Sequence, residues 1–307
     1  MVNRHAYMIM AHHRPDLLQL LLNSIDDYRN DIYVHIDQKS TMENIDFKVK
    51  KARLIFIERI NVNWAGYSQV KCEYSLLKAA VSDGHHSYYH LLTGASYPLK
   101  SQNYIHQYFN ENAGVEFVGF DNQRDYSHRA RYIYLFSEYG KLEGIKGHLV
   151  LYLRNAYIAI QKILHFDRLR DADFKIKKGL AYFSITENLA KYVIDRENDI
   201  YQLLKNTLYA DEVFLQTLVF NSRFINSVYN YENEYEGAAR ECAWPSCIGE
   251  FRIGCNFVLK DIEYLKNSNR IFALKFESSE GIELISTINQ MIKNEGPIID
   301  RECGVFQ

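Results

Sequence analysis

The sequence predicts a single α/β domain whose central sheet is mostly parallel and covered by helices. Short apolar segments of strand length alternate with longer segments in which apolar residues recur at helical spacing. Strand–helix–strand alternation of this kind builds a largely parallel sheet. No internal repeat, low-complexity linker or convincing domain boundary interrupts the 307 residues, so we expect one domain with insertions.

The alternation is clearest in the first hundred residues. Residues 6–10 (AYMIM) predict a buried strand, which ends at the polar run from His12 to Pro15. Asp16 can cap the following helix, whose apolar face extends to Ile25. The same patterns predict strands at 32–36, 54–57 and 88–92, and a helix from Ser68 to Val81 that Ser68 can cap.

Polar residues follow three of these strands directly. In open parallel sheets, ligands bind at the carboxyl ends of the strands. This places the candidate binding edge at His12, His13, Asp37 and the loop 93–98.

The middle of the chain, residues 121–178, is basic, aromatic and less regular, and we interpret it as an insertion. Within it, residues 148–166 predict a buried or surface amphipathic helix. Arg154 and Lys162 interrupt its apolar run, which stays short of the ~18 apolar residues that span a bilayer. Contact with a membrane surface is the alternative interpretation of this helix.

The last part of the chain continues the α/β pattern. Residues 181–185 predict a strand and residues 186–204 a helix. Asp211 can cap a further helix that runs to Val219. A strand is expected near 252–258, a short helix from Asp261, and a final helix at 279–293 that Gly296-Pro297 stops.

Composition excludes several classes of protein. Hydrophobic residues make up 47% and charged residues 24%, which excludes a disordered, collagenous or coiled-coil chain. The net charge of -2 argues against a nucleic-acid partner. An odd number of cysteines, five, without a secretory signal predicts a reducing, cytoplasmic compartment. The aromatic content of 14% suits a core and also carbohydrate surfaces.

Several familiar motifs are missing. The first strand is not followed by Gly-x-Gly-x-x-Gly, and neither a Walker-type Gly-Lys-Ser/Thr nor a Gly-x-Ser-x-Gly elbow occurs. The cysteines at 242, 247 and 255 lack metal-ligand spacing. Asp171-Ala172-Asp173 lies in a charged stretch with no strand before it, which favours a solvated turn. We therefore expect no metal and no cofactor.

Three features carry positive signals. Asp211 and Glu212 stand at the start of a predicted helix, where the helix dipole favours an ionised carboxylate. Such a group can accept a proton from a hydroxyl, although a simple helix cap is the plainer interpretation. Arg252 and Lys275 each lie among apolar residues, as edge cations or as ligands of a buried anion such as a diphosphate. Trp244 is either core or a stacking surface for a sugar.

The chain resembles a known family through motifs in one consistent order. These are AYMIMAHHRPDLLQLLLNSI…IYVHIDQKS, VNWAGYSQVKCEYSLLKAA and YYHLLTGASYPLKSQNYI, followed by KKGLAYFSIT and YADEVFLQTLV. Together they resemble the core-2/I-branching β-1,6-N-acetylglucosaminyltransferases and the peptide O-xylosyltransferases. The similarity runs from about residue 5 to residue 277. Two departures are Ala210, where the family has Pro, and Leu180, where it has Ser.

The resemblance implies a glycosyltransferase A-type fold without the metal-binding Asp-x-Asp. It implies an inverting, metal-independent transfer from a nucleotide sugar, usually UDP-linked, to a glycan. By position, Glu212 would be the general base, and Arg252 and Lys275 would hold the donor diphosphate. The nucleoside would lie against Ala11, His12 and Asp37. The donor and acceptor pocket would include Trp64, Ser68, Gly94, Tyr97, Arg129, Arg131, Asp211 and Trp244.

The resemblance also implies an organisation and a setting. Residues 1–110 would form a nucleotide-binding half, 111–178 an acceptor-side insertion, and 179–307 a catalytic half. A short member without an anchor looks bacterial, and would build surface polysaccharide on free or lipid-linked glycans at the inner membrane face, either in the cytoplasm or as a peripheral membrane protein. The donor sugar stays open among N-acetylglucosamine, xylose, galactose, galactofuranose and glucuronate.

Two rival functions stay open from the residues alone. One is a non-catalytic nucleotide-sugar-binding protein on the same scaffold, which would bind UDP without transfer; the set Glu212, Arg252 and Lys275 argues against it. The other is a nucleotidyltransferase, against which the missing phosphate-loop and metal motifs argue.

Overall fold

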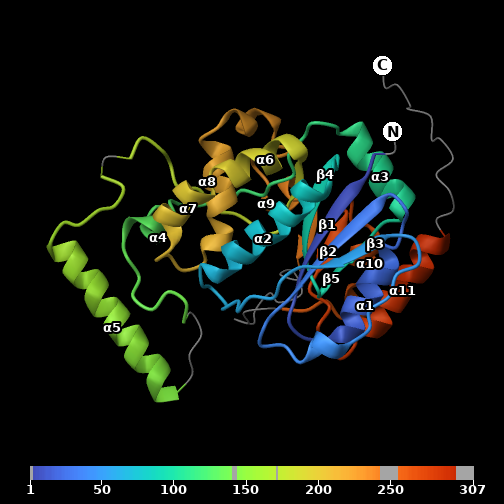
Figure 1. Cartoon of the computed structure of the whole chain (residues 1–307), viewed down its shortest axis with the longest axis horizontal. Coiled ribbons are helices and arrows are strands. Elements are labelled where there is room, and N and C mark those ends of the chain that lie inside the picture. The colour runs from blue at the N-terminus through green and yellow to red at the C-terminus, as the bar shows by residue number, and fades with distance from the viewer. Residues whose placement is uncertain (1–2, 140–143, 171, 243–254, 295–307) are drawn as a thin grey trace.

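The computed structural model describes residues 3–139, 144–170, 172–242 and 255–294. Figure 1 shows a central sheet with helices packed on both of its faces. The sheet has five strands in the order β3-β2-β1-β4-β6, and the pairs within β3-β2-β1-β4 are parallel. These strands are β1 (His5–Ala11), β2 (Asn30–Ile36), β3 (Arg53–Phe56), β4 (Tyr88–Thr93) and β6 (Ser184–Thr186). The predicted α/β class with a mostly parallel sheet is therefore confirmed.

The two faces of the sheet are covered by different helices. Successive side chains of a strand point to opposite faces of the sheet. The even-numbered residues Ala6 and Met8 of β1 therefore belong to one core, and the odd-numbered residues Tyr7 and Ile9 to another. One core joins Met8 to α2 (Ser68–Asp83), α6 (Glu187–Asp195) and α8 (Phe214–Phe220). The other joins Ile9 to α1 (Pro15–Ser24) and α3 (Gln102–Glu111). Between α6 and α8 the chain forms α7 (Glu197–Leu204) and the short turn η2 (Ala210–Glu212).

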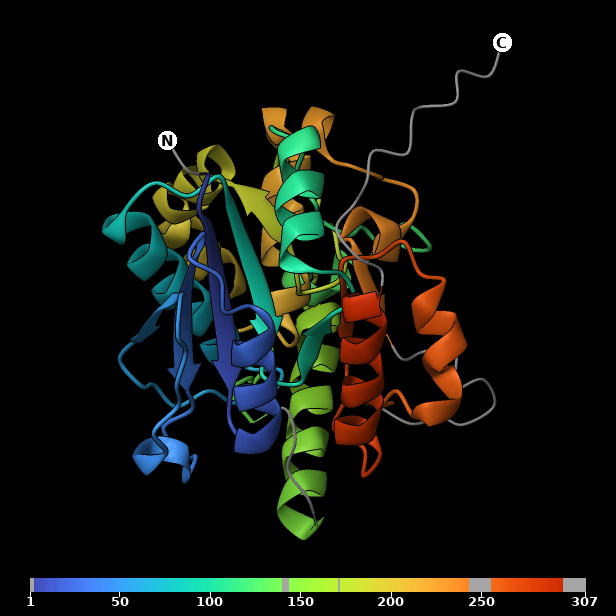
Figure 2. The ribbon, with the colours of Figure 1, turned by 90° about the vertical axis from the view of Figure 1, so that its right-hand side faces the viewer.

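A second, three-stranded sheet continues the fold, with the order β5-β8-β7. Its strands are β5 (Ser96–Pro98), β7 (Arg240–Cys242) and β8 (Phe272–Leu274). The helices α10 (Ile262–Lys266) and α11 (Gly281–Asn294) pack beside it around a third core that contains Tyr97. Figure 2 shows α11 standing next to this part of the molecule.

The middle of the chain forms α4 (His128–Arg131) and the long helix α5 (Gly144–Ile163). In Figure 1, α5 stands away from the sheet at the side of the molecule. The expected helix at 148–166 is therefore present, and it begins earlier. Within the described ranges, no helix combines the length and the apolar character that crossing a bilayer requires.

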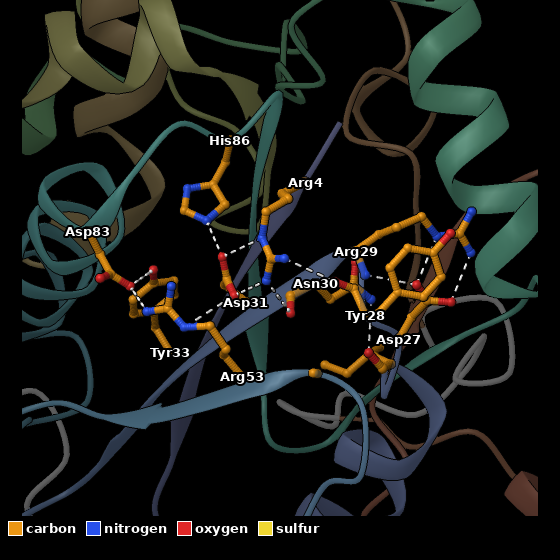
Figure 3. A network of polar contacts seen from close by, with 12 residues as sticks. Arg4, Asp27, Tyr28, Arg29, Asn30, Asp31, Tyr33, Arg53, Asp83 and His86 are labelled. Atoms are coloured by element: carbon orange, nitrogen blue, oxygen red, sulfur yellow. Dashed lines mark hydrogen bonds and ion pairs between the residues drawn. The ribbon is translucent and has the colours of Figure 1, made fainter. Parts of the chain in front are cut away.

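A network of charged side chains links the segments at the amino-terminal edge of the main sheet (Figure 3). The Asp31 carboxylate on β2 forms an ion pair with Arg4 and lies 2.8 Å from His86 Nε2 and 3.6 Å from Arg53 Nε. Although burial opposes it, these partners hold the pKa of Asp31 at about 2. Asp31 thus ties together the chain before β1, the start of β3 and the turn before β4.

Two predicted helix caps are wrong. Asp16 lies inside the first turn of α1 and pairs with Arg14, because Pro15 occupies the first helical position and starts the helix one residue earlier. Ser68 is the first residue of α2 and caps nothing. Its backbone N–H and its hydroxyl both donate to Glu138, at 3.0 Å and 2.7 Å, so a carboxylate from the insertion serves this helix N-terminus.

Three further boundaries differ from the expectation. The helix expected at 186–204 is broken at Arg196, which ends α6 and precedes α7. Asp211 lies in the η2 turn, and α8 begins after Val213, so Asp211 does not cap it. Residues 255–258 form no regular strand; β8, around Ala273, lies between β5 and β7 instead. The remaining features assigned to Asp171, Trp244, Cys247, Arg252 and Gly296-Pro297 lie outside the described residues.

Candidate active site

The carboxyl ends of the central strands lie together, as expected from a parallel sheet. The Asp37 N–H, just after β2, donates to the Ala11 carbonyl at the end of β1 at 2.8 Å. The Gly94 N–H, just after β4, donates to the Met10 carbonyl at 2.9 Å. A Cβ on Gly94 would lie 3.1 Å from the Cβ of Ala11, so the absence of a side chain allows this close approach.

Asp37 organises the loop that leads to Trp64. Its Oδ1 accepts from the Lys39 N–H at 2.7 Å, and its Oδ2 accepts from the Val62 N–H and the Lys39 ammonium, both at 3.2 Å. The carboxylate is buried, so its hydrogen bonds hold the loop rather than face open solvent. Beside it, His12 is exposed and stacks on His13, with ring centres 3.9 Å apart.

Trp64 and Tyr209 join the start of α2 to the η2 turn. The Trp64 ring is 43% exposed and meets the Tyr209 ring edge-on at 5.2 Å. The Tyr209 N–H donates to the Ala65 carbonyl at 2.9 Å. The exposed indole therefore stands next to the turn that carries Asp211 and Glu212, where it can border a ligand.

Glu212 is held by a cation and by the backbone. Arg129 Nη1 lies 2.7 Å from Glu212 Oε2, and the Glu212 carbonyl accepts from the Gly179 N–H at 2.9 Å. The guanidinium of Arg129 lies over the Tyr209 ring at 5.2 Å, which fixes it in place. The Glu212 side chain is 33% exposed, so the carboxylate is partly open to a proton donor.

Lys178 lies among three carboxylates, one of which is Glu212. Its ammonium lies 3.4 Å from Asp121, 3.8 Å from Glu234 and 3.9 Å from Glu212. Burial raises the pKa of Glu234, against the opposing pull of Lys178. Sequence reasoning missed this cluster, because its members come from four separate segments and no spacing links them.

A buried carboxyl pair lies behind Glu212. Asp211 Oδ2 accepts from Gln69 Nε2 at 3.0 Å, while Oδ1 has no hydrogen-bond partner in the part of the chain that the structure describes. Burial, followed by the charge of Glu212, raises the pKa of Asp211 to about 7. Burial also raises the pKa of Glu73 on α2 well above its usual range, with Asp211 adding to it.

Glu73 was missed, although the sequence held a signal for it. It lies one turn from Val70 and Leu77 on the apolar face of α2, where a carboxyl group has no ordinary structural reason to be. Asp211, the other member of the pair, is also buried and not open to solvent.

Lys275 follows β8 and lies near the end of β1. The residue before it, Leu274, pairs with Ser96 of β5, and the N–H of the residue after it, Phe276, donates to the Ala95 carbonyl at 3.1 Å, so Lys275 lies beside the loop after β4. Burial lowers the pKa of His12 on the same edge. The next residue but one, Glu277, lies 3.2 Å from His13 Nε2. Lys275 is thus placed at the binding edge, whereas the structure leaves its expected partner Arg252 undescribed.

Two further candidates have structural partners. Tyr97 is buried in the third core, and its hydroxyl donates to Asn289 Oδ1 at 2.9 Å, so it supports the loop after β4 from behind. Arg131 lies 3.5 Å from Asp167 and donates to Ser127 Oγ at 3.2 Å, on the insertion.

A separate cavity of about 570 Å³ lies at the other end of the sheet. It is lined by His5 and Tyr88, at the amino ends of β1 and β4, and by His106 and Glu116. The strand ends that carry Asp37 and Gly94 are at the opposite edge, so this cavity is not part of the candidate site. Within the described ranges, no group of three or more His, Cys, Asp or Glu residues is arranged to hold a metal.

Comparison with solved structures returns matches of low similarity. Mouse xyloside xylosyltransferase 1 is 10% identical, with a TM-score of 0.34 over 89% of this chain and 97% of that one. A glycosyltransferase involved in glycosylation of the major capsid of PBCV-1 is 7% identical, with a TM-score of 0.34 over 93% and 99%. S. aureus TarS is 10% identical, with a TM-score of 0.27 over 43% of this chain and 24% of that one.

No curated protein matches the sequence significantly. The family model described as Core-2/I-Branching enzyme, by contrast, matches residues 5–265, which include β1 to β7 and end before β8. The match spans the strand ends, the η2 turn and the insertion between them. The chain is therefore a glycosyltransferase that belongs to the core-2/I-branching enzyme family.

Proposed function

We propose that this glycosyltransferase transfers a sugar from a UDP-sugar to a glycan hydroxyl in one displacement with inversion. The hydroxyl oxygen bonds to the anomeric carbon while the bond from that carbon to the diphosphate breaks. The hydroxyl proton goes to the Glu212 carboxylate, and the bonding electron pair leaves with UDP. Attack from the face opposite the leaving group inverts the anomeric centre.

The placement of Glu212 is the observation that carries this proposal. It is a partly exposed carboxylate at the candidate edge, kept in one position by Arg129 at 2.7 Å. A base in a fixed position avoids the cost of orienting it in the transition state. The exposed Trp64 indole beside the same turn supplies an apolar face of the kind on which a sugar can stack.

We further propose that side-chain cations, and no metal ion, neutralise the departing diphosphate. The position of Lys275 beside the loop after β4 supports this role, since its neighbours Leu274 and Phe276 contact Ser96 and Ala95. Arg252 is the second proposed cation, carried over from the family resemblance. Fixed cations stabilise negative charge as it develops on a leaving group.

The remaining candidates take supporting roles in this proposal. Asp37 orders the loop before Trp64 from the nucleoside side. The family resemblance extends the proposal to acceptor glycans of bacterial surface polysaccharides, free or lipid-linked.

The test is a screen of UDP-sugars with glycan acceptors, in which NMR reads the anomeric configuration of the product. We expect UDP release coupled to a product of inverted configuration, at the same rate with and without EDTA. Retention of configuration would contradict the single displacement. A strong loss of transfer in EDTA would contradict the role of the cations. UDP binding without transfer or donor hydrolysis would identify a non-catalytic binding protein instead.

A further inference from the structure

The helix α5 turns an apolar stripe away from the rest of the molecule. Only two of its side chains are buried, Arg154 and Gln161, which lie about two turns apart on one face. Arg154 donates to the carbonyls of Leu135, Phe136 and Tyr139, at 3.0–3.3 Å. Gln161 bonds to both backbone groups of Ile133, at 2.9 Å and 2.8 Å. These contacts fix which face of α5 is turned toward the protein.

The opposite face is apolar along its whole length. Each residue turns a helix by about 100°, so side chains two positions from Arg154 or Gln161 point away from the protein. Those residues, Tyr152 and Ile163, are 69% and 73% exposed. Continuing at helical spacing, the outward stripe consists of Ile145, Leu149, Tyr152, Ile160 and Ile163, of which Ile145 is 88% exposed. Monomeric proteins seldom leave a continuous apolar face of this kind in water.

The charges on α5 all have one sign. Between residues 144 and 166 the chain has no Asp or Glu, and its exposed ionisable side chains are Lys146, His148, Lys162 and His165. His148 and Lys162 lie two turns on either side of Asn155, along one edge of the outward stripe. Apolar side chains flanked by basic ones match the boundary between acyl chains and anionic headgroups in a bilayer.

The position of α5 allows it to lie flat on such a surface. In Figure 1 the helix runs along the side of the molecule with no other labelled element beyond it. In Figure 2 it extends past the end of the sheet. A plane can therefore contact the stripe along the helix without meeting the α/β body.

We propose that α5 binds the surface of an anionic lipid bilayer through its outward stripe, with Lys146 and Lys162 at the headgroups. The helix lies in the interface and does not cross it, in agreement with its interrupted apolar pattern. The proposal concerns a surface away from Glu212 and does not depend on the chemistry proposed for that residue.

Co-sedimentation of the full chain with vesicles tests the proposal. The vesicles are phosphatidylcholine alone and phosphatidylcholine mixed with phosphatidylglycerol. We expect clear binding to the mixed vesicles and about 25-fold weaker binding to the neutral ones, since Lys146 and Lys162 near an anionic surface each contribute about fivefold. Equal or undetectable binding to both compositions would overturn the proposal.

Variants of the stripe identify α5 as the contact. Ile145→Ser/Tyr152→Ser/Ile163→Ser should weaken binding to the mixed vesicles by at least about tenfold, because three buried apolar groups are lost. The matched control removes two isoleucines and one tyrosine that are exposed elsewhere, Tyr28→Ser/Ile45→Ser/Ile282→Ser, and should leave binding within about twofold. Equal effects of the two variants would overturn the assignment to α5.

A charge variant keeps the test decisive if the triple variant folds poorly. Lys146→Glu/Lys162→Glu leaves the stripe intact and should lower binding to the mixed vesicles alone, by about tenfold or more. Sedimentation equilibrium without lipid distinguishes a different occupant of the stripe. A dimer that the stripe variant converts to monomer, together with absent vesicle binding, would show that a second copy of the chain covers the stripe and would overturn the proposal.

Discussion

At the scale of single residues, the contact between Arg129 and Glu212 distinguishes this carboxylate from an ordinary surface acid. The two residues lie far apart in the sequence, on α4 and η2, and their side chains meet at 2.7 Å. Arg129 in turn lies over the rings of Tyr126 and Tyr209. We infer that Arg129 is a positioning residue, which holds the Glu212 carboxylate aimed at the acceptor.

Replacing Arg129 should therefore slow transfer without loss of donor binding. Arg129→Gln should lower kcat by roughly tenfold, because Glu212 loses a charge-assisted hydrogen bond of about 1.5–3 kcal/mol. Arg129→Lys keeps the charge without the fork geometry and should restore part of the rate. Steady-state kinetics with varied donor measure both effects. A proportional rise in KM at unchanged kcat would show that Arg129 binds the donor instead.

The raised pKa of Asp211 predicts how the stability of the fold depends on pH. Burial holds its pKa at about 7 in the folded chain, above the unfolded value of 3.8. Between these values the folded state binds the extra proton, so the contribution of Asp211 to stability falls as pH rises through that window. The steepest fall is about 1.4 kcal/mol per pH unit for one proton.

The Asp211→Asn variant removes this titration and isolates it from other groups. The stability of the variant relative to the original chain should increase as pH rises from about 4 to about 7, and then stay constant. Urea unfolding at a series of pH values measures the difference. A difference that does not change with pH would show that Asp211 is ionised throughout in the fold.

At the scale of elements, a close approach of two backbone segments positions the η2 turn. A Cβ on Gly179 would lie 1.8 Å from the Gly119 carbonyl oxygen, and the Lys178 carbonyl accepts from the Asp121 N–H at 2.8 Å. The Gly179 N–H also donates to the Glu212 carbonyl. The segment 178–179 thus fixes Lys178 and the backbone of Glu212 together, which only glycine at position 179 permits.

We expect Gly179→Ala to destabilise the fold by about 2–4 kcal/mol and to reduce transfer, since backbone segments must separate. The control is Gly114→Ala, where a Cβ meets nothing within 4 Å and only the positive φ of 86° opposes it. That variant should cost about 1 kcal/mol and leave transfer unchanged. Chemical unfolding and turnover compare the two. Equal effects would remove the argument for the close approach.

The sequence predicted the elements that have strong local patterns. It did not predict the features that depend on contacts with residues far away in the chain. The strands β1, β2 and β4 are continuous apolar runs, and the sequence located them within one or two residues. The start of α2 was misjudged because its carboxylate partner, Glu138, comes from the insertion. The strand expected at 252–258 was misjudged in its described part because Phe257 packs in the third core, and its N–H donates to the Lys275 carbonyl at 2.9 Å without extending into a regular strand.

The same distinction holds for the candidate site. Asp37 and Gly94 could be placed from the sequence, because parallel strands bring their carboxyl ends to one edge. Glu212 and Lys275 were carried over by family resemblance. Arg129 and Lys178 are the partners of Glu212, and both meet it through tertiary packing. Of these two, the sequence identified Arg129 alone as a candidate, for the donor and acceptor pocket.

At the scale of the whole molecule, the two edges of the main sheet have different roles. Charge pairs around Asp31 hold the amino edge, whereas loops without regular structure meet at the carboxyl edge beside Glu212 and Lys275. The α5 helix stands to one side of both (Figure 1).

The most direct test of this account is single-turnover transfer by Glu212→Gln with saturating donor, beside an independent measurement of UDP affinity. The matched control is Glu232→Gln, an exposed carboxylate on another segment. We predict a loss of at least about a hundredfold in the transfer rate of Glu212→Gln, with UDP affinity unchanged and the control at full rate. Transfer by Glu212→Gln at a rate near that of the original chain would contradict the assignment of Glu212 as the base.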